Sequence, residues 1–535
     1  MPLGRPGITP WKSRVLAGFV ILAAEAFSIR ATGIKGDIWG AGPILTGGNQ
    51  FFRLFILPFL LTLLYVAVIR LRAAQYCGEP PAHPSRIGIA AHLACLGVFT
   101  ALTLFLTHRQ PHDSSPATLV ALWFSIGMAT AVTGILAAFG RSMIAPSTGA
   151  AALTVGAFAV ASLAGMPLVE RSWNYDSNVT VNAATGLLQH MGLDVRAEGK
   201  VIRTPHFKVI ITPACSGYEG IGLFLIFAIT WLAWFRREYR FPAALLLLPA
   251  GVALSWSLNV ARIAGYVLIG HFGHKEIAMN GFHSWAGLIA FTVLALTFCS
   301  VSPRMPGISA GAVAATVKPP RAKAATDPIF YFLGPFLAMQ AASMISRAAS
   351  GGMEWLYPLR VLAAAAVLWL YRKHYAAIEW DRKPSWFAGA VGVAAAVLWT
   401  LSAWRLPAGP GPWTQLAQAA LAWRIVWLAF RILGGVLMAP LVEELAFRGF
   451  LMRRVQGAEF VAVDARRCGW LAIALSSLLF GLMHGPRFVE GTAAGALYGY
   501  AYTRRGKLGD AIAAHALTNL LLAVVVAATG DWRYW

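Results

Sequence analysis

Residues 283–302 read HSWAGLIAFTVLALTFCSVS, a run of twenty residues that contains no Lys, Arg, Asp or Glu. A helix rises about 1.5 Å per residue, so about 20 apolar residues cross the hydrocarbon core of a bilayer. The run is therefore predicted to be a membrane-spanning helix. Pro303 and Arg304 follow it and mark its cytoplasmic end, because basic residues gather on that side of a membrane.

Similar apolar runs recur along the chain of 535 residues, which is 58% hydrophobic and only 12% charged. Soluble domains are about 25% charged, and a soluble protein would leave most of these runs uncovered. The sequence predicts an all-α polytopic membrane protein whose first run is retained, because it lacks a small-residue cleavage site. The other expected spans lie near 15–29, 54–70, 88–107, 117–139, 149–168, 216–235, 241–270, 328–346, 355–371, 386–403, 421–439, 470–485, 489–503 and 508–528.

The chain is predicted to have two domains, each a helical transmembrane bundle. Residues 303–327 combine prolines, small residues and basic residues, which is typical of a cytoplasmic linker. The linker separates a first domain at 1–302 from a second at 328–535. A polar stretch that ends in a β-like alternation at 206–212 predicts a small extracytoplasmic segment near 170–212.

The net charge of +22 does not indicate a nucleic-acid partner. The basic residues stand in short clusters between apolar runs, such as Arg236, Arg237 and Arg240, which is typical of cytoplasmic loops. The five cysteines are scattered without a CxxC pair, so neither a disulfide framework nor a zinc ribbon is expected.

Charge patterning brings three distant residues to one face of the membrane. Arg240 and its neighbours close the span 216–235 on the cytoplasmic side, so Cys215 begins that span on the opposite side. Arg262 follows Arg240 by 22 residues, about 33 Å of helix, and returns to the outer face. His283 opens the span that runs back to the basic linker. All three residues are therefore expected at one outer surface.

Their chemistry fits nucleophilic catalysis. A thiol near a helix N-terminus and a cation becomes a better nucleophile. His283 can act as base and then as acid, and Arg262 can stabilise the thiolate or a developing oxyanion. Taken singly, each residue has a plainer interpretation as a packing cysteine, an interfacial arginine or an interface histidine. Their convergence favours a catalytic site at Cys215, Arg262 and His283.

The second half holds two adjacent carboxylates, Glu443 and Glu444, inside an apolar run. Such groups are costly in a membrane and indicate a function. Arg448 lies four residues after Glu444, so these two share a helix face and are expected to form an ion pair. Glu443 is then the freer carboxylate and the expected general base.

Two further motifs follow on separate spans. His484 ends the sequence Phe480-Gly-Leu-Met-His484, and His515 and Asn519 stand four residues apart on one helical face. We expect Glu443 to deprotonate a water held by His484, with His515 and Asn519 binding the oxyanion. Two histidines and a glutamate could instead hold zinc. Because no HExxH is present, a metal-free site without a cofactor is preferred, with zinc as the alternative.

The sequence Pro213-Ala-Cys-Ser-Gly-Tyr-Glu219, followed by Asn259-Val-Ala-Arg262 and then His283, resembles the exosortase and archaeosortase family. The resemblance covers about 15–302. It implies sortase-like chemistry, in which Cys215, Arg262 and His283 act on the C-terminal sorting signals of exported precursor proteins. Transfer of the product to an acceptor is implied by analogy, and the acceptor can be water or an amine.

Glu443-Glu-Leu-Ala-Phe-Arg448, Phe480–His484 and His515–Asn519 carry the EExxxR, FxxxH and HxxxN signatures of the CPBP (Abi) intramembrane proteases, in the family's order. This resemblance covers about 328–528. Together the halves resemble the exosortase E/protease fusions. The fusion type implies a PEP-CTERM-like signal of the VPEID type and a multi-pass location in the inner membrane of a Gram-negative bacterium.

Two other classes of function are weighed against the protease. An ion-coupled transporter would use the Glu444–Arg448 pair for coupling and predicts paired inverted repeats, which the sequence does not show. An export scaffold would use these groups structurally and predicts that Cys215→Ala has no effect. The oligomeric state, the acceptor and the substrate of the second site are left open by the sequence.

Overall fold

The computed structural model describes residues 86–107, parts of 122–133, 178–212, 215, 217–310, 327–375, 384–403, 411–457 and 459–534. The chain separates into two compact units, residues 1–171 and residues 172–535. In the first unit, α5 (Arg86–Thr107) coincides with the span expected near 88–107. The spans expected near 15–29, 54–70 and 149–168 lie outside the described residues.

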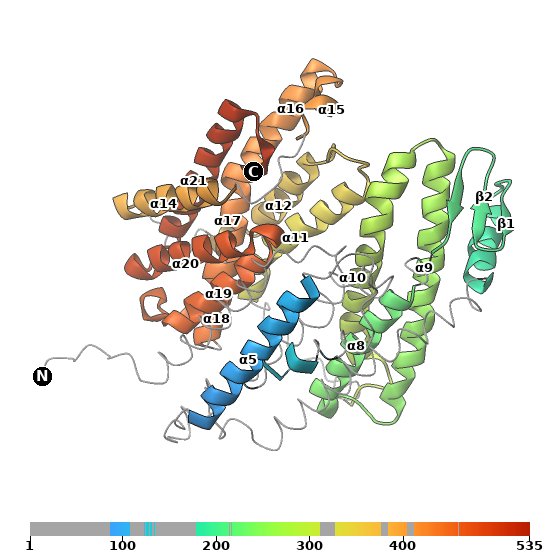
Figure 1. The fold of residues 1–535 in the computed structure, drawn as a ribbon, viewed down its shortest axis with the longest axis horizontal. Coiled ribbons are helices and arrows are strands. Elements are labelled where there is room, and N and C mark those ends of the chain that lie inside the picture. The colour runs from blue at the N-terminus through green and yellow to red at the C-terminus, as the bar shows by residue number, and fades with distance from the viewer. Residues whose placement is uncertain are drawn as a thin grey trace, which may run out of the picture. The chain divides into compact units, whose positions relative to one another are not determined.

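The second unit begins with a small cap that stands beside the helices (Figure 1). Residues 178–190 are helical, and three short strands follow: β1 (Arg196–Glu198), β2 (Val201–Arg203) and β3 (Lys208–Ile210). The strands form an antiparallel sheet in the order β1-β2-β3, with Ile202 opposite Val209. The β-like alternation in the sequence therefore forms a strand, and the described residues 178–210 of the expected polar segment form an αβββ cap.

Three long helices follow the cap in sequence. They are α8 (Tyr218–Trp234), α9 (Leu247–His271) and α10 (His283–Val301). Short helical turns join them: η5 (Arg236–Glu238), η6 (Ala243–Leu246), the π-helical turn η7 (Ile277–Phe282) and η8 (Ser302–Arg304). The expected span 241–270 is thus one continuous α-helix preceded by a 3-10 turn.

The remainder of the second unit is a larger helical bundle. Its helices are α11 (Pro328–Ala348), α12 (Pro358–Leu370), α13 (Arg372–Tyr375), α14 (Trp386–Ser402), α15 (Trp413–Ala417), α16 (Leu421–Ile432), α17 (Ala439–Glu444), α18 (Arg453–Gln456), α19 (Trp470–Leu482), α20 (Phe488–Arg505) and α21 (Leu508–Thr529). Two π-helical turns, η11 (Leu433–Met438) and η12 (Leu445–Met452), flank α17. Short 3-10 turns complete the chain: η13 (Phe460–Ala462), η14 (Ala465–Arg467), η15 (Gly485–Arg487) and η16 (Trp532–Tyr534).

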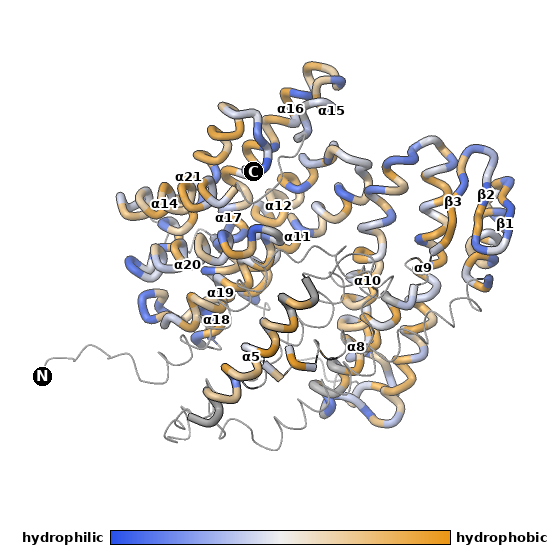
Figure 2. The backbone as a smooth tube through the Cα atoms, viewed as in Figure 1, coloured by the Kyte–Doolittle hydropathy of each residue, from blue (hydrophilic) through white to orange (hydrophobic). Residues whose placement is uncertain are grey.

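The helices have the character of membrane spans. Among the described residues, five helical segments are long and apolar enough to cross a bilayer, and several shorter apolar helices accompany them. Hydrophobic residues run along α8, α10 and α14, whereas hydrophilic residues gather on the connections and on β1 (Figure 2). On α10, Val293 and Leu296 are 53% and 62% exposed, which water would disfavour and lipid tails accept. The protein is therefore a polytopic, largely helical membrane protein.

Candidate functional sites

Cys215 lies between β3 and α8, three residues before the first residue of α8. Its Sγ is 4.0 Å from Nδ1 of His283, the first residue of α10, and 3.8 Å from Oγ1 of Thr212. Cys215 is only 6% exposed. Two of the three residues expected at the outer surface therefore meet, although they are separated by 68 positions in the sequence.

The backbone of the cysteine loop is fixed by Asn259 of α9. Nδ2 of Asn259 donates a hydrogen bond of 3.0 Å to the carbonyl oxygen of Cys215. Gly217, the N-cap of α8, has a φ of 83°, and a Cβ there would lie 2.7 Å from Nδ2 of Asn259. Glycine is required on both counts, because other residues rarely adopt this backbone conformation and none leaves this space. The Asn and Gly of the motifs thus hold the loop.

Arg262 lies one helical turn after Asn259 and reaches the adjacent helix α10. A Cβ at Gly287 would lie 2.7 Å from Nη1 of Arg262, so the guanidinium rests directly on that glycine. Gly287 follows His283 by four residues, which places both on one face of α10. Arg262 therefore lies beside the first turn of α10, which begins with His283, and the missing side chain at Gly287 makes room for the guanidinium.

The surroundings of Cys215 favour the thiolate. Burial alone would raise the pKa of the thiol. The hydrogen bond and charge of His283, the Thr212 hydroxyl and the charge of Arg262 outweigh burial, so the pKa of Cys215 is lowered from its ordinary value. A lowered thiol pKa is typical of reactive cysteines.

The cap covers this site. A single hydrophobic core joins Val181 and Leu188 of the cap helix, Ile202 of β2, Cys215 and Val267 of α9. Trp256 of α9 donates from Nε1 to Oγ1 of Thr180 at 3.2 Å and ties the helical part of the cap to the bundle. The cap therefore shields the thiol from bulk solvent.

The second site is built around a buried ion pair. Nη1 of Arg448 donates to Oε1 of Glu444 at 3.1 Å, and both side chains are fully buried. Nδ1 of His515 lies 3.0 Å from the same Oε1. Nη2 of Arg448 donates to the carbonyl oxygen of Gly495 at 2.7 Å. The predicted Glu444–Arg448 pair is present, and it also orients His515 on α21.

Glu443 faces the other nitrogen of the same histidine. Oε2 of Glu443 lies 4.0 Å from Nε2 of His515, and the Glu443 side chain is 17% exposed. Glu443, His484, His515 and Asn519 line one pocket of about 300 Å³. The two adjacent glutamates thus differ in position: Glu444 is enclosed within the ion cluster, and Glu443 borders the cavity.

The other two motifs are fixed by the backbone around them. Nδ1 of His484 is 2.8 Å from the carbonyl oxygen of Phe480, which leaves Nε2 for the cavity. The ring of Phe480 lies under the Arg448 guanidinium at 4.5 Å and 5.6 Å from the ring of His515. Nδ2 of Asn519 donates to the carbonyl oxygen of Gly435 at 2.7 Å. The Asn519 amide is therefore engaged with η11, in addition to lining the pocket.

Each site adjoins a π-helical turn. η7 ends directly before His283, η11 precedes α17 with its glutamates, and η12 carries Arg448. Such turns are uncommon and often stand at functional sites, because the added residue redirects the side chains that follow. Sequence patterns assume a uniform helix and give no sign of these turns.

Some neighbours of the sites were not predicted. Tyr498 of α20 stacks on His515 at 4.7 Å, and Gly287 and Thr212 contribute to the cysteine site as described. In the sequence, Tyr498 lies between the FxxxH and HxxxN motifs and belongs to neither, so no motif pointed to it.

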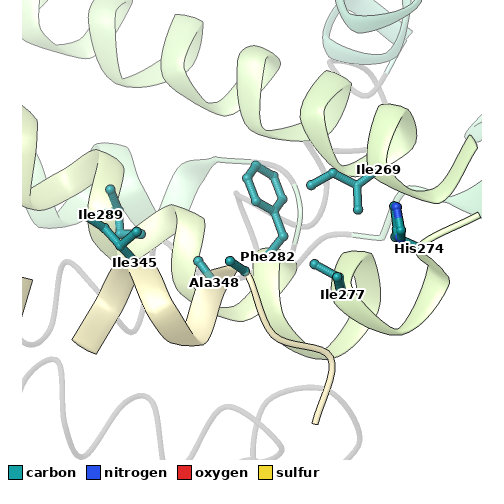
Figure 3. Close-up of a pocket in the computed structure, with 8 residues that line it drawn as sticks. Ile269, His274, Ile277, Phe282, Ile289, Ile345 and Ala348 are labelled. Carbon is teal, nitrogen blue, oxygen red and sulfur yellow. The ribbon is translucent and has the colours of Figure 1, made fainter. Parts of the chain in front are cut away.

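An open apolar cavity of about 410 Å³ lies between α9, η7, α10 and the end of α11 (Figure 3). Ile269, Phe282 and Ile345 are among the side chains that line it. Phe282 adjoins His283 in sequence, but none of the three residues of the cysteine site lines this cavity. No group of three or more His, Cys, Asp or Glu suited to a metal ion occurs in the described part of the chain.

The apolar helices and two family matches together indicate a membrane-embedded peptidase. Residues 39–300 match the family described as transmembrane exosortase, and residues 425–521 match that described as type II CAAX prenyl endopeptidase Rce1-like. The chain is therefore a fusion of an exosortase region with a CPBP-type protease region. Neither the comparison with curated proteins nor that with solved structures returned a match.

Proposed function

We propose that the protein cleaves C-terminal sorting signals from exported precursor proteins, with Cys215 as the nucleophile. The observation that supports this most is the meeting of the Cys215 thiol with Nδ1 of His283 at 4.0 Å, beside Arg262. A thiolate flanked by an imidazole and a guanidinium has the parts needed for acyl transfer.

The proposed reaction has two steps. The Cys215 sulfur attacks the scissile carbonyl carbon while His283 holds the thiol proton, and Arg262 stabilises the negative charge on the carbonyl oxygen. The C–N bond then breaks, the proton passes from His283 to the leaving amine, and a thioester stays on Cys215. Water or an amine next attacks the thioester, gives a proton to His283 and releases the cysteine.

The substrate is proposed to be a PEP-CTERM-like signal of the VPEID type, and the location the bacterial inner membrane. Support comes from the exosortase match over 39–300 and from the predicted outward position of Cys215. The cap at 178–212 is proposed to form the outer wall of the site, since its core includes Cys215.

At the second site, Glu443 is proposed to be the base of a metal-free hydrolysis, with zinc as the alternative. The 4.0 Å between Glu443 and Nε2 of His515 exceeds a direct hydrogen bond, and one water can bridge it. Glu443 would take a proton from that water, whose oxygen attacks a peptide carbonyl, and pass the proton to the leaving amine. His484 and Asn519 would hold the water or the oxyanion, and Glu444 with Arg448 would orient His515.

The two sites are proposed to act in succession. Cys215 would release the precursor from its C-terminal segment, and the Glu443 site would cut the membrane-spanning remnant. The first domain (1–302), the linker (303–327) and the second domain (328–535) would then divide the work. Removal of the remnant in a Glu443→Gln strain at the wild-type rate would contradict this division.

The cysteine step is tested by precursor processing in cells. Cys215→Ala is expected to accumulate the uncleaved precursor, detected as the longer species by immunoblot. Cys299→Ala is the matched control, because Cys299 lies in α10 away from the three residues of the site. Normal processing in Cys215→Ala would refute the cysteine mechanism and favour a scaffold.

A further inference from the structure

We propose that Tyr266 is a positioning residue of the cysteine site, whose ring holds the His283 imidazole beside the Cys215 thiol. The inference rests on the proposed pairing of Cys215 with His283. It assigns a task to a residue that lies outside the three motif positions.

Tyr266 stands on the face of α9 that carries the other site residues. It follows Arg262 by four residues and Asn259 by seven, the spacing of one helical face. Asn259 binds the Cys215 backbone, and Arg262 rests on Gly287. The three side chains form a continuous row that faces the cysteine loop and α10.

The ring of Tyr266 contacts the catalytic candidate directly. Its centroid lies 5.4 Å from that of the His283 imidazole, with 47° between the two planes. His283 is the first residue of α10 after the π-helical turn, and its Nδ1 is 4.0 Å from the thiol. At this distance a modest rotation of the imidazole separates the pair. A side chain that packs against the imidazole ring and restricts its rotation should therefore have a measurable effect on the pKa of the Cys215 thiol.

A side chain of the cap also packs against the Tyr266 ring. Phe207, in the segment before β3, packs edge-on against Tyr266 with centroids 5.7 Å apart and 81° between the planes. Phe207 in turn fits against α9 only because residue 270 is glycine, where a Cβ would lie 2.5 Å from its ring. The contacts thus run from Gly270 through Phe207 and Tyr266 to His283.

Few polar groups compete for this role. In the described part of the chain, the charged or titratable groups that lower the pKa of Cys215 are His283 of α10 and Arg262 of α9. The cap adds the neutral hydroxyl of Thr212. Tyr266 can therefore control the orientation of the His283 imidazole. Loss of that imidazole from its place beside the thiol would raise the pKa of Cys215.

The test is the pH dependence of Cys215 alkylation in the full chain, purified in detergent. Iodoacetamide labelling of the Cys215 peptide is followed by mass spectrometry at a series of pH values. Tyr266→Phe keeps the ring and should retain the wild-type midpoint. Tyr266→Leu should raise the midpoint by about one pH unit, equivalent to about tenfold less thiolate at a fixed lower pH.

Trp256→Leu is the matched control, because Trp256 also joins α9 to the cap but contacts Thr180. It should loosen the cap without raising the midpoint, because the Tyr266 ring stays against His283 and greater exposure of the thiol would, if anything, lower the pKa of Cys215. If Tyr266→Leu does not fold, Phe207→Leu, which removes the support behind the ring, should give an intermediate rise. A midpoint in Tyr266→Leu equal to that of the wild type, or an equal rise in Trp256→Leu, would overturn the inference.

His283→Ala separates this inference from the proposed function. If His283→Ala raises the midpoint and Tyr266→Leu does not, Tyr266 has no positioning role and the Cys215–His283 pair stands. If His283→Ala leaves the midpoint unchanged, the pairing itself is wrong and the positioning role falls with it.

Discussion

The Cys215 region and the Glu443 region hold their polar side chains in place by different means. Cys215 lies in a loop before α8, and its partners come from separate helices across a gap of 4.0 Å. Glu443 lies within a helix, and the adjacent Glu444 is locked to Arg448 and His515 at 3.1 and 3.0 Å. The first site is held by packing under a cap, and the second by buried charges.

The difference shows which side chains the substrate must be able to contact directly. A nucleophile forms a bond with its substrate, so if Cys215 acts as proposed its thiol must become accessible, and a loop under a cap permits this. A base that acts through water can stay inside a helix bundle if its orienting groups are fixed. Substitutions are therefore expected to unfold the second site more readily than the first.

The largest effect is expected for Arg448→Met. It leaves the carboxylate of Glu444 buried without its cation, which costs about 3–5 kcal/mol in folded proteins. Thermal unfolding in detergent should show a strongly destabilised protein. The double variant Glu444→Gln/Arg448→Met removes both charges and should recover part of the loss. Equal stability of the single and double variants would contradict a paired cluster.

Glu443→Gln should remove activity while sparing the fold. The amide has the shape of the carboxylate but cannot accept a proton, and loss of a general base costs about 10²–10⁴-fold in rate. Cleavage at the second site, followed by mass spectrometry of the released peptides, should fall by that factor with an unchanged unfolding midpoint. Retained cleavage would exclude Glu443 as the base.

The pH dependence of alkylation distinguishes Cys215 from Cys468 in one sample. His283, Thr212 and Arg262 lower the pKa of Cys215 against the effect of burial, whereas burial raises the pKa of Cys468 to about 11. Because the thiolate reacts, Cys215 should label at a lower pH than an ordinary thiol and Cys468 only at a higher one. His283→Ala should move the Cys215 midpoint upward. Coinciding midpoints for the two cysteines would contradict an activated thiol.

The smallest effect is expected for Gly287→Ala. The new methyl group would displace the end of the flexible Arg262 side chain, so precursor cleavage should fall about threefold to tenfold, or about 1 kcal/mol. Gly222→Ala in α8 is the matched control, since nothing lies within 4 Å of its added Cβ. Equal cleavage rates in the two variants would contradict a role for Arg262 in the cleavage reaction.

The helical fold was predictable because lipid requires long apolar runs. Helical spacing predicted which residues share a face within one helix, but not that Glu443, His484 and His515 of separate segments would line one pocket. The ion pair of Glu444 with Arg448 follows from their separation of four residues. The cap fold and the π-helical turns depend on tertiary packing, which spacing does not encode. For that reason the contacts of Tyr498, Tyr266 and Gly287 were found only in the structure.

One chain is proposed to carry two separate cutting sites. The most direct test is mass spectrometry of precursor, processed protein and detached C-terminal tail in Cys215→Ala and Glu443→Gln strains. We predict that Cys215→Ala accumulates the intact precursor without a tail, whereas Glu443→Gln yields processed protein and accumulates the tail. Identical product patterns in the two strains would contradict two separate sites.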